Sequence, residues 1–227
     1  MTRITAQLLV VRQRIAAAEA RFERPPGSVQ LLAVSKGQPL AALREAFAAG
    51  QRCFGESYAQ EALGKITALT DCAPEWHFIG PLQRNKTRSV AENFAWVQSL
   101  DRLALAERLN AQRPAGLPAL QVCIEVNISG ESSKSGIAPA DVPALAAAVA
   151  ALPRLRLRGL MALPAPATEF AAQLAAFQRL RALYVDLRAR GYALDTLSMG
   201  MSGDLEAAIA AGATIVRVGT AIFGERM

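Results

Sequence analysis

The stretch QLLAVSKGQPLAALREAFAAGQRCFGES, residues 30–57, decides the fold. It contains a short apolar run at 30–35, a stretch rich in alanine and leucine at 40–49, and a second apolar run at 52–55. Short apolar runs bounded by turn residues predict buried strands, and the stretch between them has the composition of a helix. A strand, a helix and a strand in this order predict a right-handed βαβ unit whose strands are parallel.

The same alternation repeats along the chain. We predict strands at 30–35, 52–55, 76–80, 95–99, 120–127, 157–162, 196–199 and 215–219. We predict helices at 40–49, 58–69, 86–92, 102–111, 139–152, 169–190 and 203–211, and one more at 4–22 ahead of the first strand. Eight strands with helices between them predict a single α/β domain over residues 1–227, a (β/α)8 TIM barrel.

The C-terminal end of the chain affects the outer ring of helices. Only eight residues follow Gly219, so we expect no helix after the last strand and an N-terminal helix, within residues 1–24, that covers this side. The alternative fold is an open doubly wound sheet, which needs a GxGxxG turn after its first strand. Residues 35–39 read SKGQP instead, and the barrel is therefore favoured.

Composition excludes several classes of protein. The net charge is +6, but the arginines are spread from Arg3 to Arg226, so we expect no specific nucleic-acid partner. Three cysteines without a CxxC pair, and a single histidine, His77, predict neither a disulfide framework nor a zinc or other metal site. No apolar run reaches the ~20 residues that span a membrane, and the N-terminus lacks an apolar signal core. We expect a cytoplasmic protein.

Lys36 is the first candidate functional residue, because active sites of such barrels lie at the carboxyl ends of the strands. Lys36 follows the first predicted strand directly. Partial burial lowers the pKa of an amine, and a neutral amine can form an imine with an aldehyde, as pyridoxal 5′-phosphate (PLP) chemistry requires. The other interpretation is a rim lysine that pairs with a carboxylate or a ligand.

The loops after the seventh and eighth strands are rich in glycine and hydroxyl residues. The first contains Ser198, Gly200, Ser202 and Gly203, and the second contains Gly219 and Thr220. Barrels of this type commonly bind phosphate at these two loops, near the start of a helix, which we expect to begin at Gly203 and Asp204. An ordinary glycine-rich turn capped by Ser202 is the alternative.

Arg217 lies inside the apolar strand IVRVG, where an unpaired charge would be costly. If it points inward it needs an acceptor, either a ring nitrogen of a ligand or a nearby carboxylate. His77 and Cys123 are also in mid-strand, and we expect both to be core or inner-layer residues.

A series of motifs resembles one family. The motifs are LLAVSK (31–36), FGESYAQE (54–61), WHFIGPLQRNK (76–86), SLDR (99–102), VNISGESSKSG (126–136), GLMALP (159–164), LSMGMSGDLEAAIAAGAT (197–214) and VRVGTAIFG (216–224). Their order and spacing resemble the YggS/PROSC family of PLP-binding, or pyridoxal phosphate homeostasis, proteins. The resemblance implies a fold-type-III PLP barrel similar to the alanine racemase N-terminal domain.

The resemblance also implies roles for individual residues. Lys36 would be the Schiff-base lysine, and Arg217 would lie near the pyridine nitrogen. The phosphate contacts would come from Ser198, Met199, Gly200, Gly219 and Thr220. Met161 and Ser57 complete the expected cofactor-binding set, although the family usually has asparagine where this chain has Ser57, so that contact would be lost or mediated by water.

Three functions are compatible with these residues. We favour a monomeric, non-catalytic carrier that holds PLP on Lys36, contributes to vitamin B6 and amino-acid homeostasis, and supplies apo-enzymes that use PLP. The alternative is a PLP-dependent enzyme acting on amino acids, such as a racemase. A racemase of this type needs a second base from an additional domain, and we expect none here. The third function, a phosphate-binding barrel enzyme without PLP, lacks a conspicuous carboxylate pair or metal cluster at the strand ends.

Overall fold

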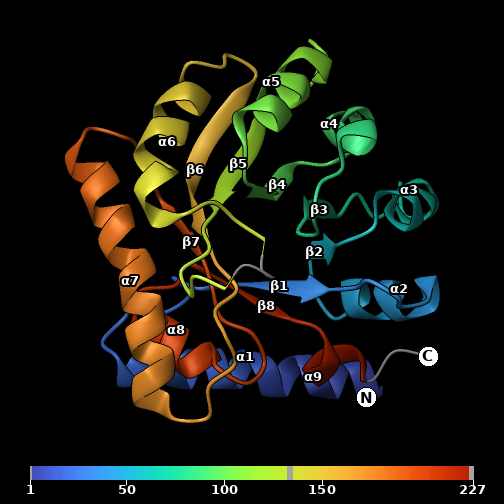
Figure 1. Ribbon diagram of the computed structural model, residues 1–227. Helices are drawn as coiled ribbons and strands as arrows, with labels where there is room; N and C mark the ends of the chain where they lie inside the picture. Colours follow the sequence, from blue (N-terminus) through green and yellow to red (C-terminus); the bar gives the residue numbers. More distant parts are fainter. Residues whose placement is uncertain (1, 132–134, 225–227) are drawn as a thin grey trace.

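Each predicted strand forms in the structure, a computed structural model that describes residues 2–131 and 135–224. The strands are β1 (Gln30–Val34), β2 (Cys53–Glu56), β3 (Glu75–Phe78), β4 (Trp96–Leu100), β5 (Leu120–Glu125), β6 (Leu155–Met161), β7 (Thr196–Ser198) and β8 (Ile215–Val218). Neighbouring strands are parallel, and β8 pairs with β1, which closes the barrel (Figure 1). The (β/α)8 barrel prediction is confirmed.

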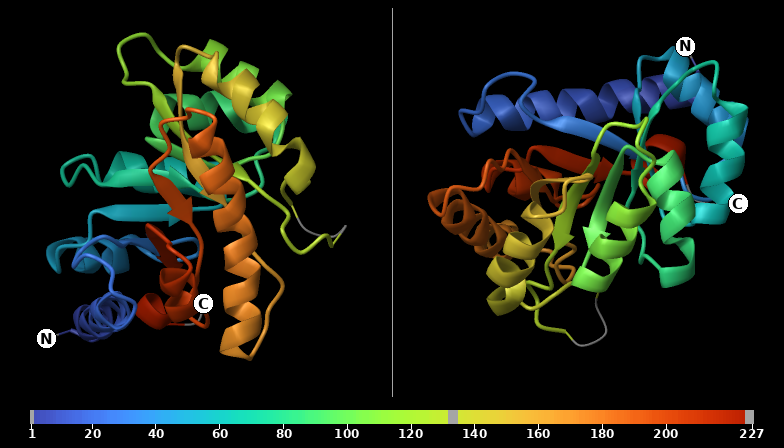
Figure 2. Two further views of the ribbon diagram at one scale, coloured as in Figure 1. Left: turned by 90° about the vertical axis from the view of Figure 1, so that its left-hand side faces the viewer. Right: turned by 90° about the horizontal axis from the view of Figure 1, so that it is seen from above.

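Helices between the strands form the outer ring (Figure 2). They are α2 (Leu40–Ala48), α3 (Ala59–Ala68), α4 (Thr87–Asn93), α5 (Leu103–Gln112), α6 (Val142–Ala150), α7 (Phe170–Ala189) and α8 (Leu205–Ala210), with 3₁₀ turns η1 (Arg84–Lys86) and η2 (Pro139–Asp141) before α4 and α6. Their apolar residues recur at spacings of three and four, as Val142, Leu145, Ala146 and Val149 do in α6, and these residues are buried. This spacing places one face of each helix on the barrel.

The N-terminal helix α1 (Arg3–Arg21) packs against α2, α8 and α9 (Thr220–Phe223), as Figure 1 shows. Arg3 joins the two ends of the chain by donating to the carbonyl of Phe223 at 2.9 Å. The prediction that no helix follows the last strand was wrong, since α9 is a single turn of four residues. One turn fits the short segment because Ile222 and Phe223 are buried under α1 and anchor it.

The interior of the barrel is separate from the main core. The main core lies between strands and helices, whereas small apolar clusters fill the inside, one around Leu32 and Ile215 and one around Met161 and Cys123. Cys123 and His77 are fully buried, which confirms their prediction as inner residues. Within the described residues, no helix combines the length and apolarity needed to cross a membrane.

Candidate functional site

A cavity of about 380 Å³ opens at the carboxyl ends of the strands. Its lining consists of Val34, Lys36, Ile79, Leu163, Met201, Ser202, Gly203, Arg217, Gly219 and Thr220. Four predicted site residues, Lys36, Arg217, Gly219 and Thr220, therefore meet at one place although they come from opposite ends of the sequence. The volume and the mixture of apolar walls with a few polar groups are typical of a small-molecule site.

The backbone on both sides of Lys36 is held by charged side chains. Lys65 Nζ donates to the carbonyl of Ser35 at 2.7 Å, and the amide of Gly37 donates to Glu61 Oε1 at 2.6 Å. Lys65 and Glu61 are themselves joined at 2.6 Å, as expected for residues four apart on one helix face. The two peptide groups that flank Lys36 are thus fixed by one ion pair, and Gly37 makes the turn with a positive φ of 70°.

Glu56 completes this network beneath the turn. It accepts from Lys65 Nζ at 2.8 Å and from the Ser35 hydroxyl at 2.6 Å. Both Glu56 and Lys65 are buried. Burial raises the pKa of Glu56, while its bonds to Lys65 and Ser35 oppose that rise. Such a pair fixes geometry, and removing one partner alone would leave the other buried without compensation.

Glycines shape the opposite wall of the cavity. Gly200 has a φ of +93°, and an added Cβ there would lie 2.5 Å from the Ala208 side chain. At Gly203, which lines the cavity, an added Cβ would meet nothing within 4 Å. Gly200 is therefore required by its backbone conformation and its contact with Ala208, whereas the space beside Gly203 is open. The helix after this loop starts at Leu205, later than the predicted Gly203, because Asp204 instead turns its carboxylate onto the Met201 amide.

Arg217 lies beneath the cavity and is only 4% exposed. It donates to the Ser198 hydroxyl at 2.8 Å and to the carbonyl of Ala162 at 2.9 Å. Burial lowers the pKa of Arg217 to about 10, and the nearby carboxyl groups of Glu125 and Asp204 oppose this. The side chain thus points inward, the case in which the sequence required an acceptor, and a hydroxyl and a backbone carbonyl accept its hydrogen bonds.

A row of hydrogen bonds continues from Arg217 through the barrel interior. Ser198 donates to Gln98 Oε1 at 2.6 Å, and the Gln98 amide nitrogen lies 2.9 Å from His77 Nδ1. Because the amide nitrogen can only donate, His77 Nδ1 accepts, and its Nε2–H donates to Glu75 at 2.8 Å. We call Arg217, Ser198, Gln98, His77 and Glu75 the interior row. Each member donates to the next, from the cavity to the opposite end of the barrel.

Glu125 is a second ionisable group near Arg217. It is buried at the end of β5. Burial, followed by repulsion from Asp101, raises the pKa of Glu125 to about 7, and Arg217 lowers it. The group is therefore poised to gain or lose a proton near neutral pH.

Comparisons with known proteins agree with this geometry. The family model for the alanine racemase N-terminal domain matches residues 8–227. A pyridoxal phosphate homeostasis protein of Pseudomonas aeruginosa is 62% identical over 226 residues, with 100% of this chain and 97% of the relative covered. The protein of the same name from Escherichia coli K12 is 55% identical, with 100% and 98% covered. The chain belongs to the pyridoxal phosphate homeostasis protein family.

A solved structure supports the same assignment. PipY of Synechococcus elongatus, determined with PLP bound, superposes with a TM-score of 0.80 at 40% identity, covering 92% of this chain and 100% of that chain. The resemblance to pyridoxal phosphate homeostasis proteins inferred from the motifs is thereby confirmed.

The remaining predicted residues surround the cavity without lining it. Ser198 is buried and reaches the cavity through Arg217, while Met161 packs inside the barrel and Met199 packs in the main core. Ser57 lines a separate cavity of about 290 Å³ with Tyr58, Gln60, Gln83, Lys86 and others. In this member of the pyridoxal phosphate homeostasis family, the serine thus faces a neighbouring pocket. Residues 132–134, including the predicted loop residue Lys134, lie outside the described residues.

Several functional neighbours were not foreseen. The ion pair between Lys65 and Glu61 could have been predicted, because the two residues are four apart on a predicted helix. Nothing in the sequence indicates that this ion pair contacts the turn at Lys36. Gln98 and Glu125 are polar residues at inward positions of apolar strands. Side chains two residues apart on a strand point to the same face. Gln98 and Glu125 could therefore have been identified from their spacing to inward-facing apolar residues of the same strand.

Proposed function

We propose that this chain binds PLP as a Schiff base on Lys36 and contributes to PLP homeostasis. The observation that carries the proposal is the cavity that Lys36 lines together with Gly219, Thr220 and Arg217. The open space at Gly203 leaves room for a bulky anion next to backbone and hydroxyl groups. The names of the relatives and the PLP found in PipY support the same ligand.

Each side chain has a distinct task in this proposal. PLP supplies an aldehyde, a pyridine ring and a phosphate. Lys36 would provide the amine that condenses with the aldehyde, with loss of water. Gly219, Thr220, Ser202 and Gly203, which line the cavity, would hold the phosphate through hydroxyl and backbone N–H groups, and the Ser198–Met199–Gly200 turn would support this loop from beneath. With PLP bound, Arg217 would lie beside the ring nitrogen, and a cation there would keep that nitrogen unprotonated and make the ring a poor electron sink.

A carrier without turnover is the function that this environment favours. An arginine beneath the ring works against the carbanion chemistry of an amino-acid enzyme. We further infer that the chain acts as a monomer in the cytoplasm and passes PLP to apo-enzymes, and the three free cysteines are compatible with a reducing compartment. The second candidate, an amino-acid enzyme, is favoured by one observation, the near-neutral pKa of about 7 at Glu125.

The experiment combines absorbance with mass spectrometry. Purified protein mixed with PLP is expected to show the absorbance of an internal imine, to lose it on borohydride treatment, and to carry the reduced adduct on Lys36. Lys36→Ala is expected to abolish all three signals, while Lys86→Ala, a change beside the other cavity, keeps them. An unchanged imine spectrum in Lys36→Ala would refute the assignment. Incubation with a panel of amino acids, scored for racemisation and decarboxylation, separates carrier from enzyme.

A further inference from the structure

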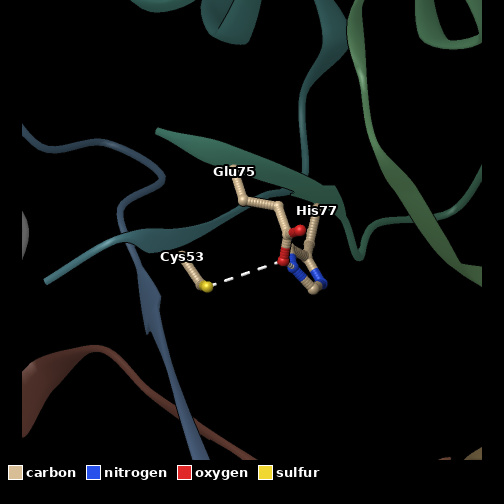
Figure 3. Close-up of side chains that lie close together, drawn as sticks. All are labelled: Cys53, Glu75 and His77. Carbon is tan, nitrogen blue, oxygen red and sulfur yellow. Dashed lines mark hydrogen bonds and ion pairs between the residues drawn. The ribbon is translucent and has the colours of Figure 1, made fainter. Parts of the chain in front are cut away.

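Three side chains of metal-ligand type meet at the amino-terminal ends of β2 and β3, the end of the barrel opposite Lys36. Cys53 and Glu75 are directly paired across the two strands, and His77 leaves β3 on the same face as Glu75. Figure 3 shows all three pointing toward one another. One sulfur, one carboxylate oxygen and one ring nitrogen lie within 4.8 Å of each other, the one such group in residues 2–131 and 135–224.

The distances are close to those of a coordination site. Glu75 Oε1 lies 2.8 Å from His77 Nε2 and 3.5 Å from Cys53 Sγ. Ligand atoms bonded to tetrahedral zinc at about 2.0–2.3 Å lie roughly 3.3–3.7 Å from one another. The Cys53 sulfur and the His77 ring nitrogen also lie within 4.8 Å of each other, so shifts of about 1 Å would let the three side chains share one ion. Thiolate, imidazole and carboxylate are also the ligands that zinc takes in proteins.

Charge balance favours the same ion. A Cys53 thiolate and the Glu75 carboxylate carry two negative charges, which a divalent cation neutralises, so the loaded site adds no net charge to the buried end of the barrel. A metal ion can also reach these side chains from solvent. A cavity of about 420 Å³ beside α1 is lined by Cys53 and Gln30 among others, and the Glu75 side chain is 42% exposed.

We propose that Cys53, Glu75 and His77 bind a divalent cation of borderline softness, with zinc as the best match, and that water takes the fourth position. Binding releases the thiol proton of Cys53 to solvent and moves the ring proton of His77 from Nε2 to Nδ1. No oxidant or further reactant is required.

The surroundings of His77 can accommodate this change. Its ring stacks on Trp96 at 5.1 Å with an angle of 6°, which holds the imidazole plane in place. A half-turn of the Gln98 amide would place its oxygen opposite Nδ1–H, and the amide nitrogen would then donate to Ser198. A histidine ligand usually donates its other ring N–H in this way, which fixes its orientation.

The test is zinc titration of tag-free, metal-free protein by calorimetry. We expect one zinc per chain, with at least about 100-fold weaker binding in Cys53→Ser and Glu75→Gln, because even partners outside the ligand set typically contribute 10–100-fold. Cys72→Ser, which changes a half-buried cysteine elsewhere, is the matched control and should bind zinc like the unmodified chain. Cobalt should give a thiolate charge-transfer band that Cys53→Ser lacks and Cys72→Ser retains.

Two results would overturn the proposal. One is no zinc binding by the unmodified protein, which would leave the three side chains as a hydrogen-bonded set. The other is unchanged affinity in Cys53→Ser or Glu75→Gln, which would place the metal elsewhere. If circular dichroism shows that Cys53→Ser does not fold, Glu75→Gln at the half-exposed position decides. PLP binding is not a readout, so this outcome is independent of the proposed function.

Discussion

Lys65 donates a 2.7 Å hydrogen bond to the backbone carbonyl of Ser35, the residue directly before Lys36. A lysine on α3 thereby helps to set the position of Lys36, the residue that we propose binds PLP. We predict that Lys65→Met lowers the rate of PLP attachment to Lys36 by about tenfold to a hundredfold, because small misplacements of a reacting group are costly. Stopped-flow absorbance of imine formation measures the rate.

Loss of stability has to be separated from loss of positioning in this experiment. Breaking the buried Lys65–Glu56 pair is expected to cost about 3–5 kcal/mol, whereas replacing both partners by apolar residues is often neutral. The double variant Glu56→Leu/Lys65→Met should therefore regain most of the unfolding free energy in urea while attachment stays slow. Recovery of both properties together would show that Lys65 contributes only to stability.

Gln98 is expected to influence the cofactor without contacting it. Gln98→Leu leaves the Ser198 hydroxyl and His77 Nδ1 buried without their partner, at a cost of about 1–3 kcal/mol for each group. Ser198 then turns and alters the hydrogen bonding of Arg217. We expect weaker PLP binding and a shifted absorbance maximum. Gln112→Leu on α5, outside the barrel interior, is the control, and an identical spectrum in both variants would contradict a role for Gln98.

Gly203 and Gly200 provide a paired test of the proposed phosphate loop. Gly203→Ala adds a methyl group to open space at the cavity, so stability should change by less than about 0.5 kcal/mol while PLP affinity falls. Gly200→Ala meets Ala208 and forces an unfavourable φ, so it should destabilise the fold by about 1–3 kcal/mol. Thermal unfolding and PLP titration distinguish the two effects. Unaltered PLP affinity in Gly203→Ala would place the phosphate elsewhere.

Glu125 predicts a pH dependence of stability. Its pKa rises from an ordinary 4.5 to about 7 on folding, so between these values the folded chain keeps a proton that the unfolded chain has lost. The contribution to stability is present below about pH 4.5 and is lost as pH rises through about 7, a total of roughly 3 kcal/mol. Glu125→Gln should remove this loss. Urea unfolding of PLP-free protein at pH 5 and pH 8 measures it, with the exposed Glu107→Gln as control.

The order of strands and helices follows from local pattern, which is why it could be predicted. Apolar runs of strand length alternate with longer amphipathic stretches, and each run corresponds to a strand in the structure. Helix α9 was not predicted, because the eight residues after Gly219 were judged too few to form a helix. A single turn held by Ile222 and Phe223 depends on burial beneath α1, a contact between the two ends of the sequence that no local pattern carries.

The candidate site was predictable where one residue type already implies its chemistry. Lys36, Arg217, Gly219 and Thr220 follow or lie in strands, and the barrel rule then places them at one rim. The residues that hydrogen-bond to these side chains, or to the backbone beside them, come from distant parts of the sequence, so their contacts depend on how the strands are aligned in the barrel. Gln98 meets Ser198 across 100 positions of sequence, and Lys65 meets Ser35 across 30, so these contacts exist only once the barrel has closed.

The hydrogen bonds of the interior row run continuously between the two ends of the barrel, so the proton positions at one end depend on those at the other. Every donor in it points the same way, so reversing the bond at His77 obliges Gln98 and Ser198 to reorder as well. An occupant at the His77 end that prefers one ordering would therefore change the orientation of the Ser198 hydroxyl beside Arg217, and thermodynamic reciprocity would make any resulting effect on affinity equal in both directions. The two faces of a rigid scaffold can thereby communicate through proton order alone, with the backbone at rest.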